Sequence, residues 1–324
     1  MTDLPVLSYD AVLAAVSPQE AIAHTREAFV RHHRGEWTMP SKVYLQSPPY
    51  GDFRAMPALG GDLAMLKWIS SFPGNPSRPE GPLPTVMGLV CVSDARTSEP
   101  LALLDARAVT ALRTGAVAAI AARALARPDA QRVAVIGCGL HGAWAARCLV
   151  AEGYGGQGGN VLVDPRPDVA RALADELGPD GWRVGSIRDA VGCDVVSLVT
   201  PGTEIVLDVG TLRPGLHLNL LGADGPGKAE MSIGAVASCA LFCDEWAQAS
   251  HGGELTGAVE AGMVRREQVT DLGAVLTGEA PGRRGTEAVT LFDSTGLAIQ
   301  DLAIATAALA ALREGRVQAQ VVTL

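Results

Sequence analysis

The sequence has no surplus of basic residues. Its 324 residues include 26 Lys and Arg against 35 Asp and Glu, which gives a formal net charge of −9 at pH 7. It also contains no long run of Lys and Arg. Nucleic-acid binding needs such residues, because basic side chains neutralise the phosphate charges. The composition therefore argues against a nucleic-acid partner, and it offers no basic patch for a membrane surface.

Signals for secretion and for metal binding are also missing. The first residues form neither a basic segment nor a long apolar run, so no signal peptide is visible. The most apolar helical run, residues 112–126, is interrupted by arginines and is shorter than the roughly 20 residues that a bilayer requires. The six cysteines are scattered, so we expect buried, reduced thiols and no metal site. These features predict a cytoplasmic protein without a membrane partner.

What the sequence does contain is 48% apolar residues with 37 Gly and 20 Pro, typical of a compact, turn-rich protein. Residues 8–35 have helical periodicity, and Ser17-Pro18 is a typical helix start. Short apolar runs between 42 and 105 predict a mainly antiparallel sheet. From residue 132 onward, apolar strands alternate with helices. That pattern predicts an α/β protein with a parallel, doubly wound sheet.

The strongest local motif is Arg132–Leu149, RVAVIGCGLHGAWAARCL. Gly137, Gly139 and Gly142 match G-x-G-x-x-G between an apolar strand and a helix, the context in which the motif binds dinucleotides. Gly137 allows the tight turn, and Gly139 lets a pyrophosphate approach the helix N-terminus. Gly142 permits close packing of helix on strand. A glycine-rich turn that binds no ligand is the alternative.

An acidic residue follows at the spacing expected for ribose recognition. Asp164 stands 22 residues after Gly142, at the end of the second strand of this pattern. A carboxylate there binds the ribose 2′-hydroxyl of NAD and repels the 2′-phosphate of NADP. The sequence therefore predicts NAD as the cofactor. Arg166, two residues further on, softens that preference.

Four polar residues stand in otherwise apolar or Gly/Pro-rich segments: Lys67, Arg54, Arg113 and Asp224. A strand lysine such as Lys67 is costly to bury unless it meets an anion, although a lysine at a sheet edge is the alternative. Guanidinium groups bind carboxylates with two parallel hydrogen bonds. Asp224 directly follows an apolar strand of the doubly wound half, where ligands bind, although a turn-forming aspartate is the alternative.

Around these residues the chain resembles the ornithine cyclodeaminase/mu-crystallin family, and within it the NAD-dependent alanine dehydrogenase branch. The resemblance extends in order over nearly the whole chain. The matching segments are MPSKVYL (39–45), GDFRAMPA (51–58), KWISSFPGNP (67–76), LPTVMGL (83–89), TALRTGA (110–116), IGCG (136–139), LLGADGPGK (220–228), HGGE (251–254) and FDSTGLAIQD (292–301).

The resemblance implies a role for each candidate residue. It makes Lys67 a substrate-contacting, proton-transferring residue, and Asp224 the residue that acts on the substrate nitrogen or on an attacking water. It makes Arg113 a ligand of the substrate carboxylate or of the cofactor, with Thr114 near the phosphates and Arg54 on the substrate. The implied substrate-binding set also includes Lys42, and the implied cofactor-binding set is Arg113, Thr114, Gly137, Gly139, Leu140, His141, Asp164, Arg166, Thr200, Pro201 and Ser294.

Two departures separate this chain from the cyclodeaminase pattern. Cyclodeaminases have a glutamate two residues before the Met-Pro pair, where this chain has Arg54, and their aspartate loop reads Asp-Cys-Pro rather than Asp-Gly-Pro. The resemblance therefore implies a dimeric, NAD-dependent enzyme that deaminates L-alanine to pyruvate and catalyses the reverse reaction. Its partners would be a small amino acid, a 2-oxo acid or an imino acid. The alternatives are a ketimine reductase acting on pyrroline- or piperideine-2-carboxylate, an ornithine cyclodeaminase, and a ligand-binding protein without activity.

A discontinuous domain organisation is expected. Residues 1–114 and 300–324 should form an α+β domain for substrate binding and dimerisation. Residues 115–299 should form the Rossmann-like, dinucleotide-binding domain. The long apolar helix predicted over 296–315 needs a cover, so it should return to the first domain or to a partner subunit.

Overall fold

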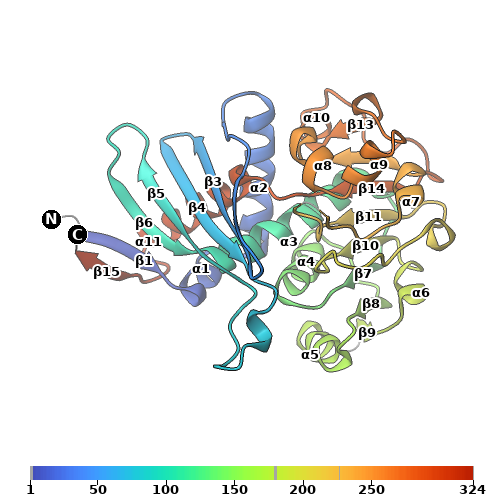
Figure 1. Ribbon diagram of the computed structural model, residues 1–324, viewed down its shortest axis with the longest axis horizontal. Coiled ribbons are helices and arrows are strands. Elements are labelled where there is room, and N and C mark those ends of the chain that lie inside the picture. Colours follow the sequence, from blue (N-terminus) through green and yellow to red (C-terminus); the bar gives the residue numbers. More distant parts are fainter. Residues whose placement is uncertain (1–2, 179–180, 226, 324) are drawn as a thin grey trace. The chain divides into compact units, whose positions relative to one another are not determined.

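The chain consists of two compact units (Figure 1), Met1–Arg113 with Leu297–Leu324 and then Thr114–Gly296. Their boundaries differ from the predicted ones by one residue at the first junction and by three residues at the second. Both units combine helices with strands, and the predicted α/β class is confirmed. The computed structural model describes residues 3–178, 181–225 and 227–323.

The described residues of the first unit form a seven-stranded sheet. Its strands are β1 (Asp3–Leu7), β2 (Val43–Ser47), β3 (Gly51–Gly60), β4 (Leu63–Ser71), β5 (Val86–Asp94), β6 (Pro100–Asp105) and β15 (Gln320–Thr323). The spatial order is β15-β1-β6-β5-β4-β3-β2, with antiparallel neighbours from β2 to β6. The predicted antiparallel sheet is confirmed. The sequence analysis missed β1, which is parallel to β6, and β15, which is antiparallel to β1.

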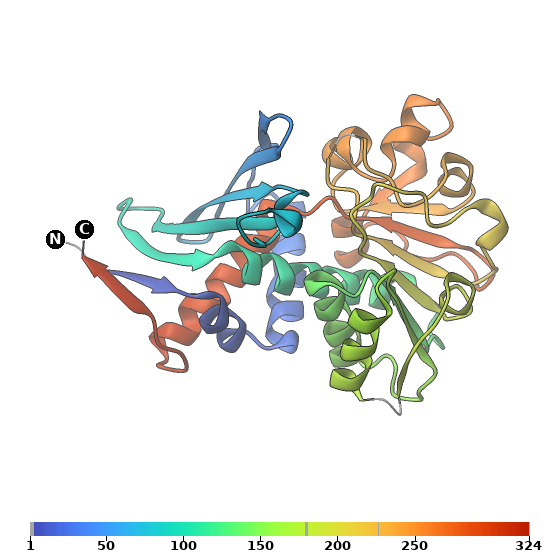
Figure 2. The same ribbon diagram turned by 60° about the horizontal axis from the view of Figure 1, so that its bottom comes forward.

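The helices of the first unit are α1 (Tyr9–Ala15), α2 (Pro18–His33) and α11 (Ala298–Arg313), with the first part of α3 (Ala106–Leu125). Ser17 and Glu20 start α2 with a reciprocal capping box, which explains the predicted helix start. Helix α11 packs against α2 and β3, and Figure 2 shows both helices on the same side of the sheet. The C-terminal helix therefore returns to the first unit, one of the two predicted outcomes.

The pleat of the sheet gives its two faces different chemistry. Successive side chains of β3 and β4 alternate between the faces. Arg54, Met56 and Lys67 are buried on the face that α11 covers, with Met56 directly opposite Lys67. Leu66 and Trp68 lie on the other face and are exposed. The polar candidate residues therefore lie on the covered face, and the uncovered face is apolar.

The described residues of the second unit form an eight-stranded, entirely parallel sheet. Its strands are β7 (Val133–Ile136), β8 (Asn160–Val163), β9 (Trp182–Val184), β10 (Val195–Leu198), β11 (His217–Leu220), β12 (Ala240–Cys243), β13 (Val269–Asp271) and β14 (Thr290–Asp293). The order is β13-β12-β14-β11-β10-β7-β8-β9. Strands β8 and β9 therefore lie on one side of β7, and the chain then crosses to the other side, where β10 lies next to β7. Ligands of doubly wound sheets bind at the carboxyl ends of the strands beside such a switch point.

Helices cover both faces of this sheet (Figure 2). They are α4 (Leu140–Ala151), α5 (Pro167–Leu177), α6 (Ile187–Ala190), α7 (Ile233–Ala237), α8 (Trp246–Gly252), α9 (Thr256–Glu260), α10 (Leu272–Leu276) and the second part of α3. On β7, Val133 and Val135 pack in a core with α4 and α5, whereas Ala134 and Ile136 pack in a second core with α7 and α9. Burial on both faces explains why this strand is a continuous apolar run rather than an alternating one.

Helix α3 requires one correction. The apolar run at 112–126 was interpreted as too short for a bilayer, but α3 has 20 residues and by length and composition alone could cross one. The argument from length is therefore wrong. In the structure, 83% of its most apolar window is buried, as in the core helix of a globular fold.

Candidate active site

The glycine turn has the backbone geometry that its sequence predicts. Gly137 follows β7 with a φ of 96°, a conformation that side chains rarely adopt. A Cβ atom on Gly142 would lie 1.8 Å from the carbonyl oxygen of Gly137, so a larger residue would push α4 away from the turn. Both glycines are therefore required by the fold of the turn itself.

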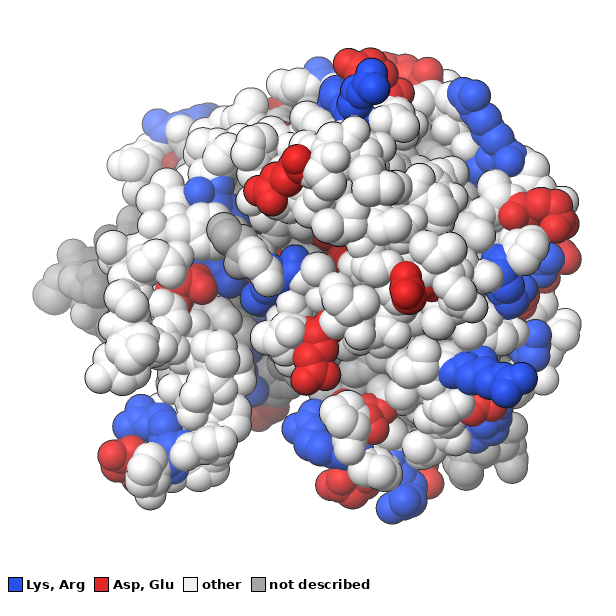
Figure 3. Space-filling model, turned by 45° about the vertical axis from the view of Figure 1, so that its right-hand side comes forward, with Lys and Arg blue, Asp and Glu red and all other residues white. Residues whose placement is uncertain are grey.

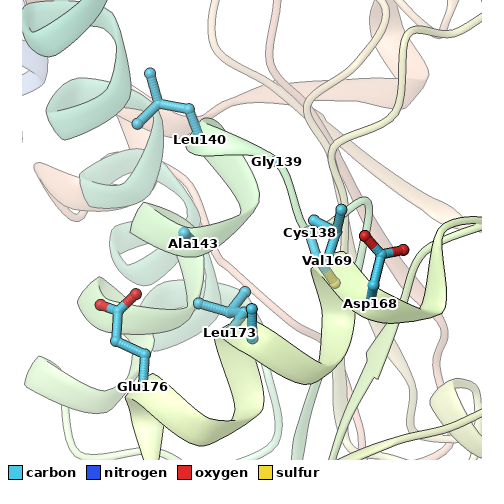
Figure 4. Close-up of a pocket in the computed structure, with 9 residues that line it drawn as sticks. Cys138, Gly139, Leu140, Ala143, Asp168, Val169, Leu173 and Glu176 are labelled. Carbon is cyan, nitrogen blue, oxygen red and sulfur yellow. The ribbon is translucent and has the colours of Figure 1, made fainter.

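Gly139 differs, because the fold does not require it. It is the N-cap of α4, has an extended backbone, and a Cβ atom there would meet nothing within 4 Å. No side chain caps this helix end, and Leu140 and His141 form its half-buried first turn. An uncapped helix N-terminus beside open space fits a pyrophosphate, which its N–H groups and dipole attract. An open groove starts at this turn and runs between α4 and α5 (Figure 4).

Asp164 follows β8 and is bonded to the same turn. Its Oδ2 accepts the N–H of Cys138 at 2.9 Å, and its Oδ1 accepts the backbone N–H and Nε of Arg166 at 3.0 Å each. Burial opposes its ionisation, but these hydrogen bonds outweigh burial and hold the pKa of Asp164 below its usual value. The carboxylate is therefore an anion at neutral pH, placed at the end of the second strand as predicted.

Cofactor candidates of the second unit and the catalytic candidate Asp224 lie at the same edge of the sheet. The carboxyl ends of parallel strands share one edge, and the candidates follow these strands directly. They are Gly137 after β7, Asp164 and Arg166 after β8, Thr200 and Pro201 after β10, Asp224 after β11, and Ser294 after β14. Ser294 is buried, and its hydroxyl is within 3.3 Å of an Asp244 carboxylate oxygen. Pro226, in the loop of Asp224, lies outside the described residues.

Two buried glutamates that the sequence analysis did not single out tie these loops together. The carboxylate of Glu230 accepts the N–H and hydroxyl of Thr200, at 2.9 and 2.7 Å, and the N–H of Gly222 at 2.8 Å. Glu254 accepts the backbone N–H groups of Glu230 and Met231. Burial raises the pKa of Glu230 above its usual value and that of Glu254 to about 7. Glu254 is the last residue of the HGGE segment, and that segment is the sequence feature that could have identified it.

Asp224 lies two residues beyond Gly222, on the loop that Glu230 holds. Its Oδ1 accepts a hydrogen bond from Lys228 Nζ at 2.6 Å, and both side chains are partly exposed. The candidate base is thus an ion-paired carboxylate at the carboxyl end of β11. Its catalytic role stays a prediction.

Lys67 is the central residue among the candidates of the first unit. It lies on β4, between β3 and β5, and is 1% exposed, so the sheet-edge alternative is wrong. Its Nζ lies 2.6 Å from Oδ2 of Asp301, a fully buried residue of α11. Burial lowers the pKa of Lys67 to about 8, although the Asp301 carboxylate raises it. Asp301 is the anion whose presence the sequence required but did not identify.

Arg113 and Arg54 lie near this pair or on the same face of the sheet. Arg113 Nε is 3.6 Å from Oδ1 of Asp301. Arg54 is 6% exposed, and its Nε lies 2.6 Å from Oδ1 of Asp52 on the same strand. Lys42 precedes β2, and its charge contributes to lowering the pKa of Lys67. The structure therefore gathers the substrate-binding candidates of the first unit, while their facing Asp224 stays a prediction.

The chain thus combines a dinucleotide-binding, doubly wound sheet with an α+β unit that buries cationic side chains, the design of a two-domain nicotinamide-dependent enzyme. Its sequence matches the model of the ornithine cyclodeaminase/mu-crystallin family over residues 5–315. The protein belongs to this family, as the resemblance predicted.

Individual relatives have several activities. The chain is 38% identical to an alanine dehydrogenase of Archaeoglobus fulgidus, over 93% of this chain and 92% of that protein. It is 33% identical to an ornithine cyclodeaminase of Agrobacterium tumefaciens, over 78% and 69%. Among solved structures, an archaeal alanine dehydrogenase dimer with bound NAD has a TM-score of 0.93 at 35% identity, covering all of both chains. The Thermococcus litoralis pyrroline-2-carboxylate reductase with NADH and L-proline has a TM-score of 0.90 at 25% identity, covering 99% of this chain.

The open space beside Gly139 allows a prediction about cofactor binding. Gly139→Val should lower the midpoint of thermal unfolding far less than Gly142→Val, because its Cβ atom enters open space. It should weaken NAD binding at least tenfold, about 1.4 kcal/mol, because the side chain fills the pyrophosphate position. Calorimetric titration with NAD and a thermal melt measure the two effects. Gly142→Val is the matched control and should lose stability as well; NAD binding at wild-type strength by Gly139→Val would contradict the assignment.

Asp164 generates a second prediction, on cofactor choice. Asp164→Ser removes the anion that repels a 2′-phosphate and releases Arg166 from its ion pair. The variant should bind NAD more weakly and discriminate less against NADP, as measured by the ratio of dissociation constants. A wild-type protein that already binds NADP tenfold more tightly than NAD would show that this reading of Asp164 is wrong.

Proposed function

We propose that the protein is an NAD-dependent oxidoreductase that deaminates L-alanine to pyruvate and ammonia and catalyses the reverse reductive amination. The observation that carries the proposal is the likeness to an alanine dehydrogenase with bound NAD, which covers the whole chain with a TM-score of 0.93. The buried lysine, the arginines and the strand-end aspartate supply the groups that this reaction needs.

The residues of the second unit fit the cofactor. Gly139 leaves open space in front of an uncapped helix N-terminus, and Asp164 presents a carboxylate after the next strand. Thr114 is 4% exposed, and its hydroxyl has no hydrogen-bond partner among the described residues, as expected of a group that serves a ligand. When bound, NAD supplies the acceptor for the hydride that leaves the substrate Cα.

Four side chains would orient the substrate and move protons. Arg113 and Arg54 would hold the α-carboxylate, so that the Cα–H bond points in one direction. Asp224 would act as the general base that activates water for attack on the iminium carbon. Lys67 would polarise the carbinolamine oxygen and carry a proton as ammonia leaves. A pKa of about 8 suits Lys67 for this role, because both protonation states are accessible near neutral pH.

A ketimine reductase is the second candidate. The likeness to a pyrroline-2-carboxylate reductase with NADH and L-proline, with a TM-score of 0.90, favours it. Such an enzyme would use the same lysine, arginines and aspartate, so the residues present do not separate the two reactions.

A substrate screen tests the proposal. Oxidative deamination of small L-amino acids and L-aspartate with NAD is measured beside the reduction of cyclic imines with NADH. We expect turnover of alanine. Turnover confined to cyclic imines would favour the reductase, and conversion of ornithine to proline would show that Arg54 does not exclude a cyclodeaminase. In the same assay, Lys67→Ala and Asp224→Ala should each lower kcat by roughly 100-fold while NAD binding persists, which separates chemistry from cofactor binding.

A homodimer is part of the proposal, and the uncovered face of the first sheet is its interface. The apolar residues of this face are Val43, Leu45, Phe53, Ala55, Pro57, Leu66, Trp68, Leu89 and Cys91. Val43, Leu45 and Leu89 are 62%, 58% and 54% exposed, which is unusual for a contiguous apolar surface in a monomer. Elsewhere, Lys and Arg lie interspersed with Asp and Glu on the surface that Figure 3 presents, so no single charge dominates that face.

Light scattering tests the dimer. At micromolar concentration the wild type should have the mass of two chains, and Leu45→Asp should shift it toward one chain, because a charge would be buried in the interface. Met263→Asp, at an apolar residue that is 48% exposed in the second unit, is the matched control and should stay dimeric. A monodisperse wild-type monomer would contradict the proposal.

A further inference from the structure

Resting on the proposed function, we infer that Asp301 is the positioning residue of the reaction: its carboxylate fixes Lys67 Nζ and the Arg113 guanidinium relative to each other. Asp301 does not touch the substrate in this scheme. It acts through the two cationic side chains that do.

The geometry of Asp301 supports this role. It lies on α11, is fully buried, and presents one carboxylate oxygen to each cation, Oδ2 to Lys67 at 2.6 Å and Oδ1 to Arg113 at 3.6 Å. Neither oxygen accepts a backbone N–H or a hydroxyl among the described residues. A buried carboxylate normally collects several such donors, so these two cations are what compensates its charge.

The groups around Lys67 show which positive charges the Asp301 carboxylate compensates. Helix α3 contributes Arg113 and the hydroxyl of Thr110, which lies 3.4 Å from Lys67 Nζ. The segment before β2 contributes Lys42, a second cation. On β3, Met56 stands opposite Lys67, and the nearby Arg54 is paired with Asp52; on β5 the opposite residue is Val90. Asp301 is thus the carboxylate paired with this lysine.

Removing that anion should deprotonate the lysine. Burial, Arg113 and Lys42 all lower the pKa of Lys67, and Asp301 opposes them. Without Asp301, the ammonium form loses its stabilising partner, so the pKa must fall further. The neutral amine no longer polarises an oxygen as a cation does. In addition, Lys67 and Arg113 both lose the carboxylate that positions them.

The sequence makes Lys67 directly observable, because the chain contains three lysines, Lys42, Lys67 and Lys228. Protein labelled with ¹³C-lysine gives three Cε signals, which single Lys→Arg variants assign. The Lys67 signal should titrate with a pKa of about 8 in the wild type. In Asp301→Asn, which keeps the shape and removes the charge, it should titrate at least about one pH unit lower, a tenfold loss of proton affinity.

The kinetic arm separates positioning from folding. Asp301→Asn should lower kcat at least tenfold while the dissociation constant of NAD stays within twofold. Asp301→Glu keeps the charge but displaces the carboxylate by one methylene, so it should keep Lys67 protonated near neutral pH and still lower kcat. Thr306→Val, a nearly isosteric change on the same helix, is the control for α11 and should alter neither the Lys67 pKa nor kcat.

An unchanged Lys67 pKa in Asp301→Asn would overturn the inference. If that variant does not fold, wild-type kcat in Asp301→Glu would overturn it instead. The two proposals also fail separately. A wild-type protein without turnover on any amino or imino acid contradicts the proposed function, whereas the lysine titration still decides whether Asp301 controls Lys67.

Discussion

The buried charge of Lys67 constrains the whole first unit. Moving an ammonium group out of water costs several kcal/mol unless an anion compensates it within the protein. The compensating carboxylate, Asp301, is 234 residues away along the chain. It reaches Lys67 because the chain returns to the first sheet after completing the second unit, and α11 then covers the sheet face that carries the lysine. This pairing therefore depends on the discontinuous organisation of the first unit.

In the second unit, buried carboxylates hold the loops at the strand ends in place. A parallel sheet leaves its strand-end loops without mutual backbone pairing, so other groups must hold them. Glu230 joins the loops that carry Thr200 and Asp224, and Asp293 accepts the N–H of Leu255 beside Glu254. Burial raises the pKa of both Glu230 and Asp293. The loops at this edge depend on the hydrogen bonds that these carboxylates accept.

Local features were predictable from the sequence, and long-range partners were not. The turn at Gly137 and the start of α2 at Ser17 depend on residues within a few positions, so their sequence patterns suffice. The burial of Lys67 required an anion, but nothing local indicated which one. Asp301 was visible as a lone charge in an apolar helical run, yet its partner is known only once the fold is. The strands β9 and β13 have three residues each, too few to show periodicity.

The charge pairing within the first unit bears on which residue holds the substrate carboxylate. Arg54 is matched by Asp52, and Lys67 is matched by Asp301 at hydrogen-bonding distance. Arg113 shares Asp301 only at 3.6 Å, and its Nε has no hydrogen-bond partner among the described residues. A buried donor left unpaired costs free energy that a ligand can recover. Arg113 therefore has unmet capacity for a carboxylate, and Arg54 would loosen its pair with Asp52 to share that carboxylate. The unmatched donor therefore belongs to Arg113, the residue proposed to hold the substrate carboxylate.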